Sequence, residues 1–169
     1  CRLTGRVVDQ SGAAVVDHEL WLLRAEKRPP DYLVSYSEKD VVSRTKTGSD
    51  GSYELLRVPA GEWWIGCAPT RDGWQPATPD AIAPLVTLVH VPDDVDEVRQ
   101  DLVVHRGLYI RGRVIDSAGE PAAKMYVTTS SEAWTHHSGA STGDDGTFAV
   151  GPLVPGPYSL RALGHGEHA

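Results

Sequence analysis

The chain has 169 residues, a formal net charge of -7, 40% hydrophobic residues and 23% charged residues. This composition is that of an ordinary globular protein, and the acidic excess disfavours a nucleic-acid backbone or an anionic membrane surface as the main partner, because both require a basic surface. No apolar run approaches the ~20 residues that cross a bilayer, and 17 Gly with 12 Pro favour short strands joined by tight turns.

The first predicted strand opens a sequence block that occurs twice. Residues 3–12 (LTGRVVDQSG) return 107 positions later as residues 110–119 (IRGRVIDSAG). In both copies apolar or glycine positions alternate with polar ones, which is typical of a half-buried strand. Each strand is followed by an acidic residue and a glycine, which predict a turn.

A second block repeats with a different shift. Residues 50–55 (DGSYEL) return as residues 145–150 (DGTFAV), 95 positions later, so the first copy holds twelve additional residues between the two blocks. The Asp-Gly pair predicts a hairpin turn in each copy, with Tyr53 and Phe148 pointing inward after it.

The third block predicts a strand with one buried face. Residues 58–67 (VPAGEWWIGC) correspond to residues 153–162 (LVPGPYSLRA) at the same shift of 95. Period-two alternation turns the following side chains inward in the two copies: Trp63, Ile65 and Cys67 in the first, and Tyr158, Leu160 and Ala162 in the second.

Three further segments of the first copy differ from a compact pattern. Residues 24–39 are expected to form an extended surface loop before a strand at 41–46, and the proline-rich residues 68–92 form a long excursion with a short extra strand at 85–89. Val98–His105 supplies the last strand of this copy, and the acidic residues around it are interpreted as a solvated loop and strand edge. Only six residues follow Leu163, so the second copy is expected to lack its last strand, and the chain is expected to be a fragment of a longer protein.

These blocks, in the order G-R-V-x-D-x-x-G, x-D-G-x-[YF] and [VL]-x-x-G-x-[WY]-x-[IL], resemble the carboxypeptidase regulatory-like (transthyretin-like, prealbumin-like) family. The resemblance implies an all-β fold of two tandem seven-stranded Greek-key sandwiches. It also implies an accessory module of secreted or cell-surface bacterial proteins, also found beside metallocarboxypeptidase domains, and it does not itself imply an enzyme. The expected domains are residues 1–106, with long loop insertions, and the shorter residues 107–169.

The two cysteines are too few for a disulfide framework. A single Cys1–Cys67 bridge stays open in an oxidising compartment, although Cys67 falls on an inward strand position. Lipid modification of Cys1 is disfavoured against a fragment boundary, because the strand pattern begins at once and leaves no tether.

No catalytic, cofactor or metal site is predicted. His136 and His137 are adjacent and point to opposite faces of a strand, and the spacing of His165 and His168 fits no usual zinc pattern. The chain has no G-x-S-x-G elbow and no H-E-x-x-H or H-x-x-E pair, so peptidase activity is not supported.

The residues leave a structural spacer and a binding module as the two main hypotheses. Sugar rings stack on exposed aromatic faces, and the core pattern does not require Trp64, Trp74 or Trp134. A carbohydrate-binding surface would bring these three residues together, whereas in a spacer Trp64 packs under a loop or against a neighbouring domain. The spacer is preferred, with neighbouring domains of a longer chain as partners and polysaccharide or protein as the alternative ligand.

Overall fold

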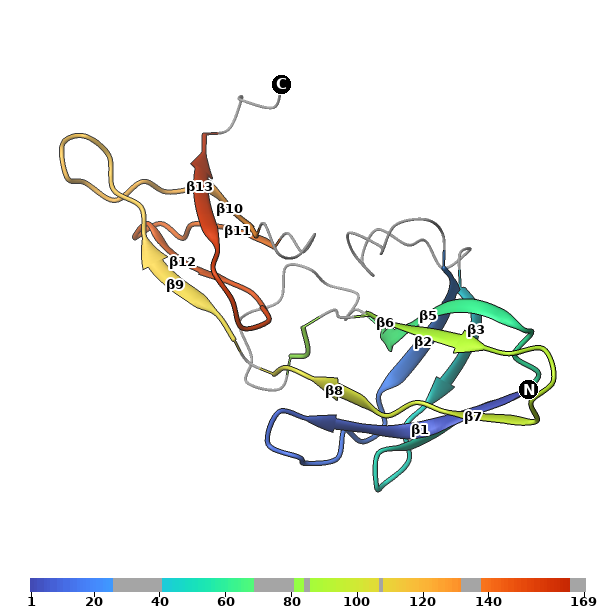
Figure 1. Ribbon diagram of the computed structural model, residues 1–169. Coiled ribbons are helices and arrows are strands. Elements are labelled where there is room, and N and C mark those ends of the chain that lie inside the picture. Colours follow the sequence, from blue (N-terminus) through green and yellow to red (C-terminus); the bar gives the residue numbers. More distant parts are fainter. Residues whose placement is uncertain (26–40, 69–80, 84–85, 107, 132–137, 165–169) are drawn as a thin grey trace. The chain divides into compact units, whose positions relative to one another are not determined.

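The computed structural model describes residues 1–25, 41–68, 81–83, 86–106, 108–131 and 138–164, and these residues contain thirteen β-strands and no helix (Figure 1). The prediction of an all-β sandwich fold is confirmed. The contacts among the described residues divide into two compact units. The first comprises residues up to 68 with 86–105, and the second comprises 106–164 with the short piece 81–83.

One sheet of the first unit is built around the N-terminal strand. Strand β1 (Arg2–Asp9) pairs antiparallel with β4 (Ser52–Leu55) on one side. On its other side it pairs in parallel with two short consecutive strands, β7 (Glu97–Arg99) and β8 (Leu102–Val104). Both edges of β1 are therefore occupied.

The other sheet of the first unit has the strand order β3-β2-β5-β6, with antiparallel pairing throughout. The strands are β2 (Glu19–Arg24), β3 (Val41–Lys46), β5 (Gly61–Cys67) and β6 (Val86–Val91). Strand β6 lies where the sequence predicts a short extra strand, and it covers the edge of β5.

The core of the first unit is formed by inward residues of both sheets. Leu3 and Val7 of β1 and Leu20, Leu22 and Ile65 of the second sheet have no solvent exposure at all. Burial of large apolar side chains on both inner faces is the main stabilising contribution in a sandwich of this kind. Trp63, Ile65 and Cys67 are all buried, as their alternation predicts.

The second unit has a two-stranded and a three-stranded sheet. In the two-stranded sheet, β9 (Ile110–Arg113) pairs antiparallel with β12 (Thr147–Val150). In the three-stranded sheet, the strand order is β11 (Gly139–Ser141), β10 (Tyr126–Ser130) and β13 (Ser159–Leu163).

The two units share strand registers at the shifts seen in the sequence. Leu20 pairs with Cys67 in the first unit, and the residues at shifts of 107 and 95, Val127 and Ala162, pair in the second. The turns also match: Gly51 and Gly146 both have positive φ, at 81° and 74°. A Cβ on either glycine would lie 2.5 Å from the carbonyl oxygen of Val7 or Val114, so both turns require glycine.

The second unit has five strands among its described residues, and none of them corresponds to β6, β7 or β8. As a result β9 and β13 each have one neighbouring strand, where β1 and β5 have neighbours on both sides. Exposure follows this difference. Ile65 is fully buried, whereas its counterpart Leu160 is 47% exposed.

Candidate functional site

Trp64 lies on the outer face of the β3-β2-β5-β6 sheet, opposite to its neighbours Trp63 and Ile65, as alternation predicts. Its side chain is half-buried and packs against Trp21 and Leu23 of β2. Its indole Nε1 is buried and has no hydrogen-bond partner among the residues that the structure describes. Because a buried N–H without an acceptor costs free energy, this group is available to an acceptor that comes close to the ring.

Trp64 belongs to a cluster of apolar side chains on this outer face, which we call the outer cluster. Leu23 is fully buried there and Trp21 is 8% exposed. The partly buried members are Val41, Trp64, Ala68 and Val86. The sheet thus packs apolar side chains on both of its faces.

Polar groups lie around Trp21 at the margin of the outer cluster. The Trp21 Nε1 donates to Glu19 Oε1 at 2.8 Å, and the Arg44 guanidinium lies 5.5 Å from the centre of the indole ring. Arg44 and Glu19 form an ion pair at 3.6 Å. An indole ring beside a carboxylate and a guanidinium offers an apolar face next to charged groups, although here Trp21 is nearly covered.

The other two tryptophans of the predicted carbohydrate surface, Trp74 and Trp134, lie outside the described residues. The prediction that Trp64, Trp74 and Trp134 share one open surface therefore stays a prediction. The same holds for the arrangement of His136, His137, His165 and His168.

The repeat pattern does not predict Trp21 and Leu23 as members of an outer-face cluster. A signal was present in the uninterrupted apolar run Leu20–Leu23, because a strand with apolar residues at consecutive positions is covered on both faces.

Four aspartates hold the paired turns of the two units. Asp9 Oδ1 accepts hydrogen bonds from the backbone N–H groups of Ser11 and Ala13, and Asp116 does the same for the residues at a shift of 107. Asp50 and Asp145 each accept a bond from the backbone N–H two residues further on, at 2.9 and 3.0 Å. These carboxylates complete turns of the backbone.

Hydrogen bonding lowers the pKa of both Asp50 and Asp145. The largest cause is the hydroxyl of Ser52 or Thr147, followed by the backbone N–H of the same residue. A general acid needs a carboxyl whose pKa is raised toward neutrality, and these two are shifted in the opposite direction.

A second polar group lies along the pairing of β1 with β7 and β8. The Thr4 hydroxyl donates to Glu97 Oε1 at 2.8 Å, and the Arg6 backbone N–H donates to Asp101 Oδ1 at 2.9 Å. The Arg2 guanidinium also pairs with Glu97, and this bond is the largest cause of the lowered pKa of that carboxyl. The acidic residues of this segment join strands, which refines their interpretation as a solvated strand edge.

Tyr53 is a buried tyrosine in the same region. Its hydroxyl donates to the Gln100 carbonyl oxygen at 2.6 Å, in the connection between β7 and β8. Burial raises its pKa strongly, with the negative charge of Asp101 as the second cause, so the hydroxyl keeps its proton.

Cys67 is buried and Cys1 is half-buried, and neither forms a disulfide bond. Within the ranges given above, no three His, Cys, Asp or Glu side chains gather as ligands of a metal ion would. The same residues include no helix long and apolar enough to cross a membrane.

The fold places the described residues in the class of β-sandwich proteins. Residues 109–168 match the profile of the carboxypeptidase regulatory-like domain, which covers about a third of the chain. No curated protein matches the sequence.

Solved structures with similar architecture come from bacteria. A streptococcal ancillary pilin has a TM-score of 0.43 and 17% identity, over 96% of this chain and 53% of the pilin. A DUF3823 family protein from Parabacteroides merdae has a TM-score of 0.38 and 18% identity, over 88% of this chain and 77% of that one. The minor pilin of Streptococcus agalactiae has a TM-score of 0.38 and 14% identity, over 96% and 83%. The chain thus spans about half the length of the ancillary pilin, and likenesses this distant carry no conclusion about function.

Proposed function

We propose that the chain is a non-catalytic structural module: two tandem carboxypeptidase regulatory-like domains, bounded near residue 106, that space neighbouring parts of a longer secreted or cell-surface bacterial protein. The observation that carries the proposal is that the positioned polar side chains serve the fold. Asp9, Asp50, Asp116 and Asp145 hold turns, and Glu97 and Asp101 join strands.

The family match of residues 109–168 supports the assignment of the second domain, and the shared strand registers support the same assignment for the first. Perturbed acid and base groups gather at catalytic sites. The carboxylates with shifted pKa values in this chain, Asp50, Glu97, Asp101 and Asp145, are all lowered by bonds within the fold, which favours a structural role.

A replacement experiment tests the spacer function in the parent protein. Residues 1–169 are exchanged for an unrelated pair of β-sandwich domains of similar length, and a second variant deletes them. A spacer predicts that the activity or surface exposure of the flanking parts survives the exchange and is reduced by the deletion. Loss of function in the exchange variant would instead show that this particular sequence is recognised.

A carbohydrate-binding module is the second candidate, because the buried Nε1 of Trp64 meets no acceptor within the described ranges and the ring packs against Trp21, which lies beside Glu19 and Arg44. Titration with a panel of bacterial and plant polysaccharides, followed by tryptophan fluorescence, separates the two functions. The spacer predicts no saturable change. Binding that saturates and that Trp64→Ala removes, with Trp63→Phe as the control on the inner face, would support the carbohydrate function.

A further inference from the structure

The two ends of the first unit lie on neighbouring strands. Strand β1 begins at Arg2, and β8 ends at Val104, next to the boundary with the second unit. The short strands β7 and β8 run parallel to β1 along its length (Figure 1). Arg2 pairs with Glu97 at the start of this pairing, and Asp9 pairs with Val104 at its end. The chain therefore enters the pairing at one end and leaves it at the other.

This arrangement decides how the unit responds to tension along the chain. A pull on the chain before Arg2 draws β1 toward its N-terminal end, and a pull after Val104 draws β8 in the opposite direction. The strands are then loaded along their axes, so the hydrogen bonds between them share the force and break together. Forced unfolding is governed by the rate of unfolding, and that rate falls as more bonds must break in one step.

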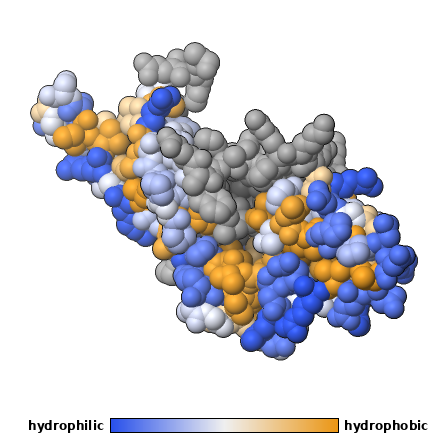
Figure 2. All heavy atoms as spheres, in the orientation of Figure 1, coloured by the Kyte–Doolittle hydropathy of each residue, from blue (hydrophilic) through white to orange (hydrophobic). Residues whose placement is uncertain are grey.

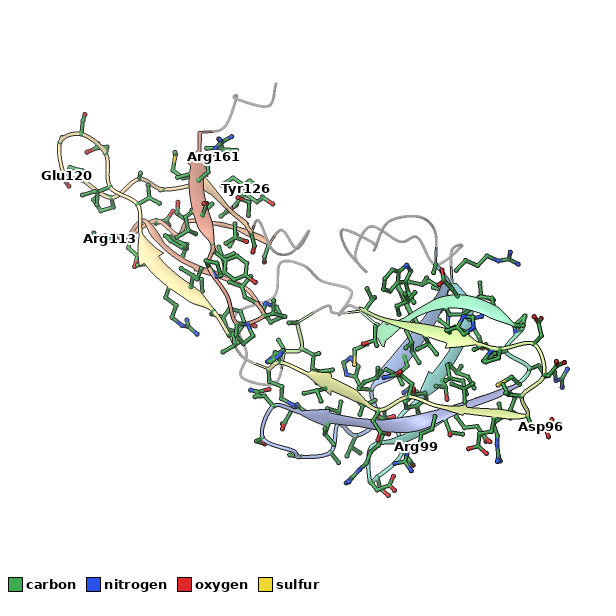
Figure 3. All side chains as sticks on the ribbon, in the orientation of Figure 1. Asp96, Arg99, Arg113, Glu120, Tyr126 and Arg161 are labelled. Atoms are coloured by element: carbon green, nitrogen blue, oxygen red, sulfur yellow. The ribbon has the colours of Figure 1, made fainter. Side chains whose placement is uncertain are left out.

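Backbone hydrogen bonds join the strands at the start and near the middle of the pairing. The Arg2 N–H donates to the Asp96 carbonyl oxygen at 2.7 Å, and the Gln100 N–H donates to the Thr4 carbonyl oxygen at 2.8 Å. Figure 3 labels Asp96 and Arg99, which lie directly before β7 and at its end. Because these bonds connect β1 to the same segment, sliding of β1 along β7 stretches them together.

Two carboxylates add side-chain bonds to the same pairing. Glu97 accepts a hydrogen bond from the Thr4 hydroxyl at 2.8 Å and pairs with the Arg2 guanidinium. Asp101 accepts a bond from the Arg6 N–H at 2.9 Å, between the two short strands. Both carboxylates are exposed, and Figure 2 shows hydrophilic side chains at the surface of the first unit. Exposed pairs of this kind add little to stability at equilibrium, but under tension they break in the same step as the backbone bonds.

Gly5, in the middle of β1, locks the register of the pairing. A Cβ at Gly5 would overlap the Gln100 carbonyl oxygen and would lie 2.8 Å from the ring of Tyr53. The Tyr53 hydroxyl donates to the same carbonyl oxygen at 2.6 Å, so the ring and the carbonyl enclose the glycine. Alternate residues of a strand share a face, so a slip of β1 by two residues toward its N-terminal end would bring Val7 into this place. A valine side chain does not fit there, and β1 therefore cannot slide in small steps.

We propose that the first unit is a tension-bearing module, in which residues 2–9 and 97–104 form a clamp that is loaded in shear. The bonds of the pairing and the register fixed by Gly5 make the two segments separate in one step. As a role in the parent protein, the clamp rests on the spacer function proposed above, because a spacer transmits force between the parts that it separates. The resistance to force itself depends only on the first unit.

Single-molecule force spectroscopy of chain 1–169 tests the clamp by changing the direction of the load. In one arrangement, handles hold the two ends of the chain. Unfolding of the first unit is then recognised by a length increase of roughly 300 Å, because about 100 residues extend to ~3.5 Å each. In the other arrangement, the handles are attached through Gln10→Cys and Val103→Cys in a Cys1→Ser background. Both positions are exposed and lie at the same end of the pairing, and Cys67 is buried.

At equal force, unfolding is expected to be about tenfold or more slower when the chain ends are held, because the bonds then break in one step and not in succession. The second arrangement pulls the strands apart from one end and is expected to open them bond by bond. Equal unfolding rates in the two arrangements would overturn the proposal.

Asp101→Ala removes the acceptor of the Arg6 N–H and is expected to speed unfolding about three- to tenfold when the chain ends are held. The matched control is Glu62→Ala, which removes an exposed carboxylate of β5 outside the clamp and is expected to leave the rate unchanged. With handles at positions 10 and 103, Asp101→Ala is expected to have a smaller effect. An equal acceleration in both arrangements would show general destabilisation and contradict the proposal.

The clamp and the spacer function fail in different experiments. The clamp is measured on the chain alone, whereas the spacer function is measured by domain exchange in the parent protein. Unfolding that is independent of the load direction would overturn the clamp even if the exchange variant keeps its function. Slow unfolding with the chain ends held, together with loss of function in the exchange variant, would support the clamp and contradict the spacer function.

Discussion

Two buried threonines occupy equivalent places in the two units. Thr142 Oγ1 accepts the Met125 N–H at 2.9 Å and donates to Ala122 O at 2.7 Å. Thr47 Oγ1 accepts the His18 N–H at 2.9 Å. Because these residues are 4–5% exposed, water cannot replace the bonds that they make.

Thr142→Val is therefore expected to lower the free energy of unfolding by about 1–3 kcal/mol, since it leaves a buried N–H without an acceptor in a side chain of nearly the same shape. Thr47→Val is expected to act similarly. Denaturant titration measures both, with Thr45→Val on the half-buried strand β3 as the control. A loss for Thr142→Val no larger than that of the control would contradict this role.

Because of the turn aspartates, the stability of the folded chain is expected to depend on pH in the acidic range. The pKa values of Asp50 and Asp145 are lowered in the folded chain, so their contribution is present above the ordinary aspartate pKa of about 4 and is lost as pH falls through the folded values. The unfolding midpoint is expected to stay level from neutral pH to about 4 and to fall below it.

The double variant Asp50→Asn and Asp145→Asn tests this cause, because asparagine keeps an acceptor oxygen and loses the charge. Its midpoint is expected to depend less on pH below about 4 than that of the parent chain. An identical acid slope in both proteins would assign the effect to other carboxylates.

At the scale of the element, Trp63 of β5 and Tyr158, directly before β13, make the same bond and differ in burial. Trp63 Nε1 donates to Pro59 O at 2.9 Å, and the Tyr158 hydroxyl donates to Val154 O at 3.0 Å. Trp63 is 4% exposed, whereas Tyr158 is half-buried, and in the described part of the second unit no strand corresponding to β6 lies beside β13.

Trp63→Ala is expected to cost about 3–5 kcal/mol of unfolding free energy, as a truncation within a packed core. The sequence alone predicts the same cost for Tyr158→Ala, but its partial exposure reduces the expected loss to about 1–3 kcal/mol. Denaturant midpoints give both values. Equal losses would indicate that β13 is covered by a segment beyond the described strands.

The sequence predicts the elements whose neighbours lie within the repeat. Alternation places Leu3, Val7, Tyr53 and Trp63 inward, and all four are buried. It cannot predict that Asp101 replaces a backbone acceptor for Arg6 and separates β7 from β8, because that depends on a side chain 95 positions away. Nor can it predict the outer cluster around Leu23, since burial of the outer face depends on what packs there.

For the same reason, alternation alone does not predict how far each side chain of the second unit is buried. Leu160 occupies the position of Ile65 and has the same apolar character, yet it is 47% exposed. Of the three tryptophans of the predicted carbohydrate surface, the described structure contains Trp64, which lies on the outer face and is half-buried. A residue's type predicts its preferred side of a strand, whereas its exposure is decided by the strands beside it.

At the scale of the whole molecule, each unit buries its own apolar residues. Leu22 is fully buried in the first unit and Val150 in the second. Two separate cores allow two unfolding transitions, so the chain is expected to depart from two-state behaviour. The second unit is expected to unfold first, because its described residues form fewer strands and include fewer fully buried large apolar side chains.

Leu22→Ala and Val150→Ala test this expectation by calorimetry. Each is expected to shift the transition of its own unit, Leu22→Ala by a loss of about 2–5 kcal/mol. One cooperative transition that both substitutions shift equally would contradict two separate cores.

Residue-resolved hydrogen exchange of the free chain tests the central claim most directly, namely that one strand pattern is built twice. The amides of Val7 and Val114, which donate to Gly51 and Gly146, are expected to exchange slowly. Rapid exchange at Val114 with slow exchange at Val7 would contradict the repeated strand pairing.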